Sequence, residues 1–473
     1  MTLTTLLVAI AVAAFLGLVT RNRGRVPLLL GVSALAVYAL QPALPVRGLD
    51  FWLPTLTLAL AALAWALTTP REARSWKANW LAVAILGGIT LTLGLTRLLN
   101  LSLPLTASRP PQTLQIVVFL LVVALVGFLL ARFTQPGKFA LTAAFVFVIV
   151  LFIFLKVPAL SLLVSQFLRT LNVQSTATAS ALDLRWLGFS YVAFRLLHTV
   201  RDRQSGRLPA VSLAEYVTYI IFFPALAAGP IDRIERFVAD LRRPLALTAD
   251  DLGEAGKRLV MGLFKKFAVA DALAILAMNG ANVLQVQSTG WAWVLLYAYA
   301  FQIYFDFSGY TDIAIGLARL LGFKLPENFN APFLKPNLTQ FWNNWHMTLT
   351  QWFRAYYFNP VMRALRSTKK PLPVPALILI TQVSTMLLIG LWHGVTWNFV
   401  LWGLWHGLGL FFHNRWSEAT KARFARLSPR GQKILNIGGA FLTFNFVALG
   451  WVFFALPTLS ASFHFLLVLF GAA

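Results

Sequence analysis

The 473-residue chain contains no cysteine, and this absence excludes a thiol nucleophile, a disulfide framework and a cysteine-ligated metal. Charged residues are also scarce. They make up only 12% of the chain, against about 25% in soluble domains. Hydrophobic residues make up 58% of the chain, and Phe and Trp alone number 39 and 16. This composition predicts a polytopic membrane protein.

Acidic residues are few, since 16 Asp and Glu stand against 40 Lys and Arg. The resulting net charge of +24 could indicate a nucleic-acid partner. The basic residues, however, cluster in short loops between apolar runs, as in the cytoplasmic loops of membrane proteins. We therefore expect anionic lipid headgroups as the counter-charge, and no nucleic-acid partner. The basic residues that flank the odd-numbered runs favour an outside N-terminus: Arg21, Arg23, Arg25, Arg71, Arg74, Lys77, Arg132 and Lys138.

Apolar runs of spanning or near-spanning length recur in the first third of the chain. A helix needs about 20 residues to cross a bilayer. The first run lacks a basic leader and a small-residue cleavage site, so we expect it to be retained as a span. The runs are Leu3–Val19, Val26–Leu40, Phe51–Leu67, Trp80–Leu95, Leu114–Leu130 and Phe139–Leu155.

After residue 156 the apolar runs become shorter and carry charges. Irregular backbone and charges persist at membrane depth only where protein or a water-filled cavity surrounds them. We therefore expect the C-terminal two-thirds to enclose a cavity. Asp306 and Asp312 interrupt the apolar segment 291–322. We expect them to pair with Arg or to accept backbone hydrogen bonds at a helix break near Gly309, in preference to acting as catalytic acids.

Two histidines lie in aromatic, apolar surroundings. Segment 338–358 has its aromatic residues on one face of an amphipathic helix, with His346 at the edge of that face. His346 is either functional or a hydrogen-bonded anchor. His393 lies at the end of an apolar run, before Gly394, and an imidazole there suits proton abstraction near neutral pH. The alternative is a structural His393 bonded to a backbone carbonyl.

No metal site is expected, because His393, His406 and His413 lack ligand spacing and no carboxylate accompanies them. We interpret His198, His406, His413 and His464 as structural.

An ordered set of motifs resembles the membrane-bound O-acyltransferase (MBOAT) family over residues 115–455. The motifs are Phe222-Phe223-Pro224, Gly229-Pro230-Ile231, Asp306-Phe307-Ser308-Gly309-Tyr310, Glu327-Asn328-Phe329-Asn330, Phe341-Trp342, Trp345-His346 and Leu391-Trp392-His393-Gly394. They are similar to those of the bacterial branch that acylates envelope polymers, both its teichoic acid D-alanylation members and its alginate O-acetylation members. The chain departs from that branch at Ala355, where an Asp is usual, and at Pro360-Val361-Met362-Arg363, where Pro-Leu-Gly-Gly is frequent in the acetylation members.

The resemblance implies an all-α MBOAT fold of roughly 11–14 transmembrane or re-entrant helices around a funnel or tunnel. It implies N-terminal helices over residues 1–114, a catalytic core over 115–457 and an apolar segment over 458–473. His393 would be the catalytic base and His346 its essential partner. We expect five further residues to contact the substrate or orient the imidazoles: Asn343, Trp392, Asn398, Asp306 and Asn328.

The resemblance further implies an enzyme of the cytoplasmic membrane that moves an activated acyl group, with acetyl favoured, to a hydroxyl of an extracytoplasmic polysaccharide or envelope polymer. No cofactor would be bound permanently. The donor would be a thioester, either acetyl-CoA or the phosphopantetheine of a carrier protein, and a carrier protein or a secreted acetyltransferase could be a partner. Three alternatives stay open: D-alanyl transfer to a teichoic-acid-like polymer, transport of an envelope precursor, and a scaffold without activity.

Overall fold

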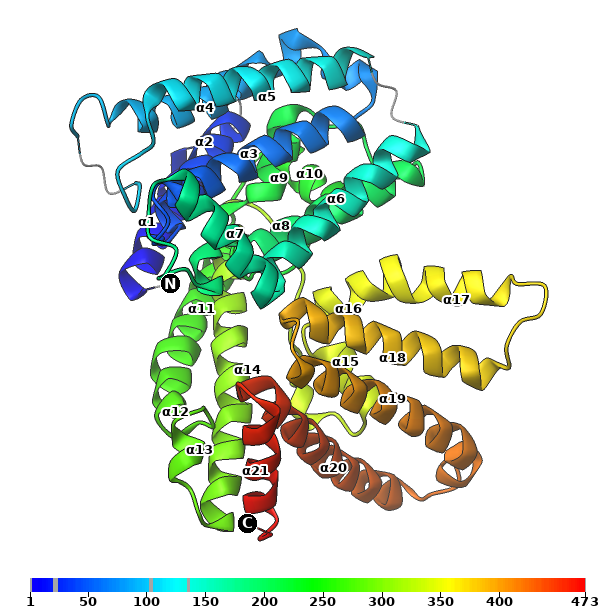
Figure 1. Cartoon of the computed structure of the whole chain (residues 1–473). Helices are drawn as coiled ribbons and strands as arrows, with labels where there is room; N and C mark the ends of the chain where they lie inside the picture. Colours follow the sequence, from blue (N-terminus) through cyan, green and yellow to red (C-terminus); the bar gives the residue numbers. More distant parts are fainter. Residues whose placement is uncertain (1, 20–23, 102–104, 134–136, 473) are drawn as a thin grey trace. The chain divides into compact units, whose positions relative to one another are not determined.

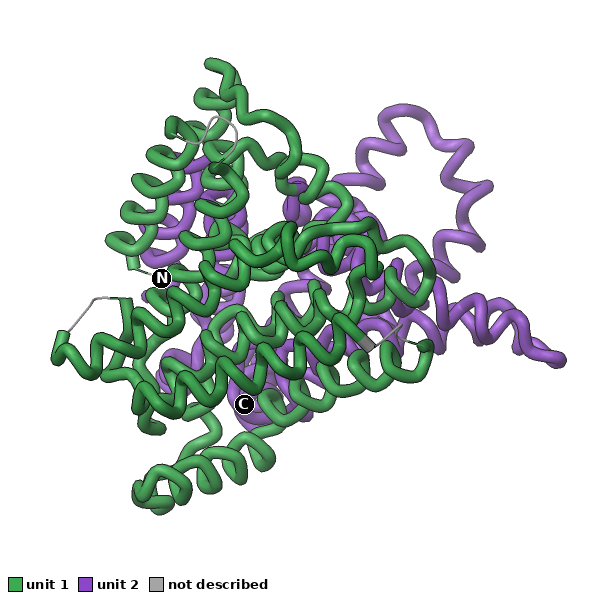
Figure 2. The backbone as a smooth tube through the Cα atoms, turned by 90° about the horizontal axis from the view of Figure 1, so that it is seen from above, with its two compact units in different colours: residues 1–257, 314–325 green, residues 258–313, 326–473 purple. Residues whose placement is uncertain are grey.

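The computed structural model describes residues 2–19, 24–101, 105–133 and 137–472, and these residues form helices and no strand (Figure 1). Arg21 and Arg23, two of the basic residues used for orientation, lie outside the described residues. The chain forms two compact units. Unit 1 contains residues 1–257 and 314–325, and unit 2 contains residues 258–313 and 326–473 (Figure 2). The boundaries expected at residues 114 and 457 stay predictions.

Unit 1 contains the N-terminal helices. They are α1 (Leu3–Val19), α2 (Arg25–Leu40), α3 (Leu49–Thr68), α4 (Trp76–Leu95), α5 (Thr113–Phe133), α6 (Lys138–Lys156), α7 (Pro158–Leu171), α8 (Phe189–Gln204), α9 (Leu213–Ile221), α10 (Ile234–Arg242) and most of α11 (Ala249–Leu263). Unit 2 contains most of α14 (Thr289–Leu320), followed by α15 (Leu338–Asn344), α16 (Met347–Phe353), α17 (Asn359–Arg366), α18 (Val374–His393), α19 (Trp397–Phe424), α20 (Pro429–Ala455) and α21 (Leu459–Leu469). Two short helices, α12 (Asp271–Leu276) and α13 (Asn282–Gln285), precede α14.

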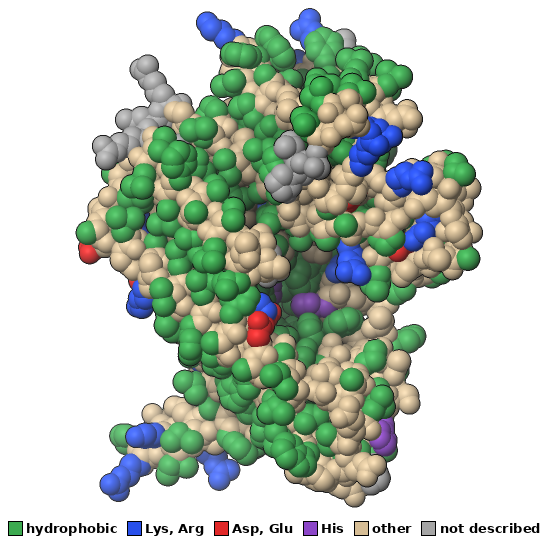
Figure 3. All heavy atoms as spheres, turned by 90° about the vertical axis from the view of Figure 1, so that its left-hand side faces the viewer, with side chains coloured by type: hydrophobic (Ala, Val, Ile, Leu, Met, Phe, Trp, Pro, Cys, Tyr) green, Lys and Arg blue, Asp and Glu red, His purple; other side chains and the backbone are tan. Residues whose placement is uncertain are grey.

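Six helices in the described part of the chain are long and apolar enough to cross a membrane: α3, α4, α5, α6, α18 and α20. Large apolar side chains such as Leu121, Phe128 and Phe147 are exposed on α5 and α6, as expected where lipid is the solvent. Apolar side chains also cover much of the face drawn in Figure 3, where charged ones form small groups. The all-α, multi-pass prediction is confirmed, and the expected total of 11–14 crossing or re-entrant helices stays a prediction.

Arg25 links distant segments of unit 1 through hydrogen bonds. Its guanidinium is buried and donates hydrogen bonds to the backbone carbonyls of Asp240, at 3.0 Å, and Arg243, at 2.8 Å. It also donates to the carbonyl of Leu321, at 2.5 Å, and so joins three distant parts of the chain. Arg25 was expected as a loop charge facing lipid headgroups, and the structure places its guanidinium inside the protein instead.

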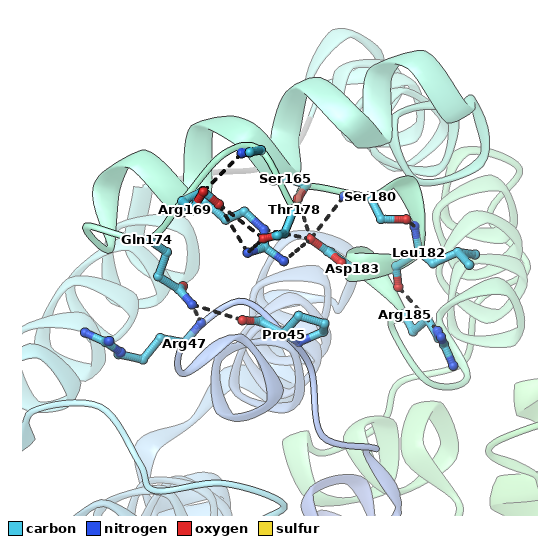
Figure 4. A network of polar contacts seen from close by, with 12 residues as sticks. Pro45, Arg47, Ser165, Arg169, Gln174, Thr178, Ser180, Leu182, Asp183 and Arg185 are labelled. Carbon is cyan, nitrogen blue, oxygen red and sulfur yellow. Dashed lines mark hydrogen bonds and ion pairs between the residues drawn. The ribbon is translucent and has the colours of Figure 1, made fainter.

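A second polar network joins α7 to the short 3₁₀ helix Ala181–Leu184 (Figure 4). Arg169 forms a buried ion pair with Asp183, at 2.8 Å, and Ser165 donates to the same carboxylate oxygen at 2.7 Å. Three polar side chains of α7, those of Ser161, Ser165 and Arg169, therefore face the protein, while apolar ones such as Phe167 are exposed. This arrangement is the inverse of a water-exposed amphipathic helix, and it suits an apolar solvent outside.

In unit 2, α14 is continuous through Gly309, so the helix break expected there is wrong. The glycine serves a helix crossing instead. A Cβ on Gly309 would lie 2.8 Å from the carbonyl oxygen of Gly262, and one on Gly262 would lie 2.7 Å from that of Gly309. Only glycine allows the two backbones to approach this closely.

Charge pairs flank this crossing. Asp312 bonds to Arg258 and Lys265, each at 2.6 Å, and Asp306 pairs with Lys266. Part of the sequence-based expectation for the two acids is therefore confirmed, since both are paired with cations inside a helical segment. One of the partners is Arg258 and the others are lysines.

Candidate active site

The hairpin of α18 and α19 places His393 at the C-terminal end of α18. Small residues allow these two helices to pack closely. A Cβ on Gly403 would lie 2.8 Å from the Cα of Leu387, and one on Gly407 would lie 2.8 Å from the Cα of Val383. Because glycine is required at two successive turns of α19, the position of α18, and with it His393, depends on this contact.

Aromatic rings surround the half-buried imidazole of His393. The ring centroids of Trp392 and Phe454 lie 4.5 and 4.7 Å from it, and that of Trp402 lies 5.8 Å away. These rings come from α18, α20 and α19. Apolar rings of this kind lower the local polarity and so strengthen electrostatic interactions made beside them.

His346 does not lie on a continuous amphipathic helix, so that prediction is wrong. The segment is divided into α15 and α16, and His346 stands between them with left-handed backbone angles of φ 42° and ψ 53°. A residue other than glycine rarely adopts this conformation, which costs of order 1–3 kcal/mol unless its surroundings enforce it. The strain therefore points to a side chain whose position matters.

Asn328 is the residue that holds His346. The Nδ1 atom of His346 lies 3.1 Å from the Asn328 Oδ1, and the backbone N–H of Met347 donates to the Asn328 carbonyl at 2.9 Å. Both side chains are buried, with exposed fractions of 3% for His346 and 0% for Asn328. His346 lies outside the six spanning helices, and burial lowers its pKa to about 3, so the imidazole is neutral at physiological pH.

Trp392 connects the two histidines. Its ring centroid lies 6.3 Å from that of His346 and 4.5 Å from that of His393, and both contacts are edge-to-face. The structure thus brings together His346, Trp392 and His393 in unit 2, from segments far apart in the sequence. The roles of His393 as base and of His346 as its partner stay predictions.

The other three residues expected near the substrate have partners within the protein. Asn343 is exposed and accepts a hydrogen bond from Arg354 at 2.6 Å. Asn398 is buried, and its amide donates to the carbonyl of Leu456 at 2.7 Å and to the hydroxyl of Ser462 at 3.1 Å. Asp306 pairs with Lys266 at the helix crossing. These contacts stabilise the fold around the histidines, and none of them reaches His346 or His393.

His406 is completely buried beside the site and was interpreted as structural. Its ring lies 4.9 Å from that of Trp402 and 5.1 Å from that of Trp342. Neither of its ring nitrogens has a hydrogen-bond partner among the described residues. The aromatic packing agrees with a structural role, whereas the two unpartnered nitrogens are a feature that the sequence did not indicate.

Comparison with known proteins places the sequence in a family. The chain is 35% identical over 279 residues to a Pseudomonas aeruginosa protein named "Probable alginate O-acetylase", which covers 59% of this chain and 50% of that protein. It is 30% identical to the teichoic acid D-alanyltransferase of Streptococcus thermophilus, over 60% of this chain and 71% of that protein. It is also 35% identical to the peptidoglycan O-acetyltransferase of Helicobacter pylori, over 52% of this chain and 45% of that protein.

The chain thus spans about half the length of the alginate and peptidoglycan relatives that it matches. The sequence profile of the MBOAT, membrane-bound O-acyltransferase family matches residues 137–457, which include His346, Trp392 and His393. On this match, the chain belongs to the membrane-bound O-acyltransferase family.

Proposed function

We propose that this protein is an O-acyltransferase of the cytoplasmic membrane that moves an acyl group, most simply acetyl, from a thioester to a hydroxyl of an extracytoplasmic polysaccharide. The observation that carries the proposal is the cluster of His346, Trp392 and His393. Two imidazoles, one between short helices and one at the end of a spanning helix, share one aromatic partner. The names of the relatives, which are O-acetylases, an O-acetyltransferase and D-alanyltransferases, support the same chemistry.

His393 acts as the general base. A ring nitrogen takes the proton of the acceptor hydroxyl while the oxygen attacks the thioester carbonyl carbon. The tetrahedral intermediate then collapses, the carbon–sulfur bond breaks, and the imidazolium returns the proton to the departing thiolate. The products are an ester and a free thiol, and His393 is neutral again. General base catalysis of this kind contributes about 10²–10⁴-fold to a rate.

The donor is a thioester carried by a phosphate-bearing group, either CoA or the phosphopantetheine of a carrier protein. No Asp or Glu occurs from residue 328 to residue 417. Within that stretch, exposed basic residues gather around α17: Arg354, Arg363, Arg366, Lys369 and Lys370. This surface suits phosphate groups, although the positive bias of membrane-protein loops also accounts for it. It lies next to Ala355, where the family resemblance leads us to expect an Asp.

D-alanyl transfer from a carrier protein is the second candidate, because the chain covers 71% of the D-alanyltransferase of Streptococcus thermophilus. Both reactions use the same base and the same thioester chemistry. They differ in the acyl group and in whether a carrier protein must dock.

Purified protein in proteoliposomes tests these proposals. The wild type and His393→Gln are incubated with an oligosaccharide acceptor and either acetyl-CoA or a D-alanyl carrier protein, and thiol release and ester formation are followed together. We expect equal amounts of thiol and ester with one donor, and a loss of at least about 100-fold in His393→Gln. Ester formation that is unchanged in His393→Gln would refute the role of His393. Substrate uptake without any donor would favour a transporter.

A further inference from the structure

The hydrogen bonds of Asn328 determine which nitrogen of His346 carries the ring hydrogen. Three groups share the Asn328 Oδ1 atom: the backbone N–H of Thr348 at 3.2 Å, the Thr348 hydroxyl at 2.9 Å and the His346 Nδ1 at 3.1 Å. Asn328 lies 18 residues before His346 in the sequence, so this contact belongs to the tertiary structure.

The orientation of the Asn328 amide follows from its partners. A backbone N–H can only donate, so the Asn328 atom that faces the Thr348 N–H must be the carbonyl oxygen. A carbonyl oxygen can only accept, and the His346 Nδ1 that shares it must therefore carry the hydrogen. A neutral imidazole has one hydrogen, which leaves Nε2 as an acceptor with a free lone pair.

The Nε2 atom is buried and has no hydrogen-bond partner among the described residues, and the same is true of the Asn328 amide nitrogen. Leaving a buried polar atom unpaired is unfavourable, and such atoms in a native fold call for an explanation. The rings next to His346 are those of Phe307, at 4.7 Å, and Trp392, at 6.3 Å. The strained backbone of His346 adds a second cost at the same residue.

We propose that Asn328 is a positioning residue that holds His346 in the Nδ1–H tautomer, so that His346 receives a hydrogen bond from a hydroxyl of the acceptor at Nε2. The inference rests on the proposed acyl transfer for the identity of the ligand, and it deepens the role of His346. A neutral imidazole in this tautomer cannot donate to an oxyanion through Nε2. His393 takes the reacting proton, and His346 binds a neighbouring hydroxyl of the same acceptor, as saccharides with adjacent hydroxyls allow.

The tautomer is tested without turnover. The chain has six histidines, so ¹⁵N-histidine labelling of the full-length protein in nanodiscs gives few imidazole signals, and His346→Gln identifies the one that belongs to His346. We expect the hydrogen of His346 to show its one-bond coupling to Nδ1. A hydrogen on Nε2 in the wild type would overturn the proposal, whether or not the protein transfers acyl groups.

Two substitutions of Asn328 test its role in the reaction. Asn328→Asp keeps an oxygen for Nδ1 and for Thr348, whereas Asn328→Leu removes it. We expect Asn328→Leu to lose the Nδ1–H signature and to lower kcat/KM for the acceptor about fivefold or more, mainly through KM, with KM for the thioester donor unchanged. Asn328→Asp should retain the tautomer and most of the acceptor affinity.

The matched control is Thr350→Val, which removes a polar group from α16, the helix that His346 precedes. It should change neither KM for the acceptor nor KM for the thioester donor. If Asn328→Leu fails to fold, the proposal is still tested by the tautomer of His346 in the wild type and by the acceptor KM of Asn328→Asp. An Asn328→Leu protein that is folded and keeps the wild-type kcat/KM for the acceptor would overturn the proposal. A wild-type protein that shows the Nδ1–H tautomer but transfers no acyl group would instead refute the proposed function.

Discussion

Asp312→Ala should destabilise unit 2 much more than Glu327→Ala, although both acids pair with Arg258. The two oxygens of Asp312 bond to Arg258 and Lys265 at 2.6 Å each, and the side chain is 9% exposed. Glu327 bonds to the same Arg258 at 2.5 Å, but its side chain is 48% exposed. The comparison therefore separates burial from the mere presence of an ion pair.

The magnitude follows from what each change leaves behind. Asp312→Ala leaves Arg258 and Lys265 without their shared carboxylate, and removing one partner of a buried pair costs about 3–5 kcal/mol. The two cations are 25% and 22% exposed, so water recovers part of the loss and we expect about 2–3 kcal/mol. Glu327→Ala leaves Arg258 bonded to Asp312, and an exposed pair contributes only about 0–1 kcal/mol.

Thermal unfolding of the detergent-solubilised protein, followed by the fluorescence of its 16 tryptophans, measures the difference. We expect Asp312→Ala to lower the apparent Tm by about 5 °C and Glu327→Ala by about 1 °C or less. Raising the salt concentration should abolish the small effect of Glu327→Ala and leave the larger one in place. Equal shifts in the two variants would refute the view that burial decides the contribution of these pairs.

Three further predictions follow from other contacts. Gly403→Leu should separate α18 from α19, because its Cβ would lie 2.8 Å from the Cα of Leu387. We expect the free energy of unfolding to fall by about 1–3 kcal/mol and acyl transfer to fall with it. The control is Gly438→Ala at an exposed glycine, where an added Cβ meets nothing within 4 Å. Asp183→Ala should leave the buried Arg169 without its carboxylate partner and expose the loop after α7 to protease. Protease resistance equal to that of the wild type would contradict this expectation. Burial raises the pKa of Asp183, but hydrogen bonds from Ser165 and Arg169 outweigh this effect and hold the pKa below its ordinary value. The ionised carboxylate therefore stabilises this junction above about pH 4, and we expect the wild type to become more sensitive to protease as the pH falls below that value. Asp183→Ala, which has no carboxylate to titrate, should not show this pH dependence.

The spanning helices could be predicted from the sequence because length and apolar composition alone decide them. The predicted run Phe139–Leu155 and the observed α6, Lys138–Lys156, differ by one residue at each end. The pairing of Asp306 and Asp312 with cations was also predictable, because an unpaired carboxylate in an apolar segment is unfavourable.

Other features depend on contacts that no local pattern records. The periodicity around His346 predicts one helix, but Asn328 and Thr348 hold His346 in a left-handed conformation that divides it. The sequence predicts a helix break at Gly309, yet the helix continues there and Gly309 packs directly against Gly262. Arg25 reads as a loop charge, yet its guanidinium binds backbone carbonyls of α10 and of the segment that follows α14.

Asn328 illustrates the same limit at the candidate site. Its place in a motif predicts a residue that contacts the substrate or orients the imidazoles. Its carbonyl oxygen contacts His346 and Thr348, which agrees with the second role, and contact with the substrate stays a prediction. A single chain gives no signal for such a pairing across 18 residues, because the partners become neighbours only when the segments before α15 and after it fold together.

The central claim is that His393 is the base of an acyl transfer, and the ester content of the cell envelope tests it most directly. Cells that lack the native protein are complemented with the wild type, with His393→Ala or with the control His413→Ala, at matched protein levels in the membrane. Ester-linked acetyl and D-alanyl groups are then released with mild base and quantified. We predict that the wild type and His413→Ala restore one of these esters and that His393→Ala restores none above background; full restoration by His393→Ala would contradict the account.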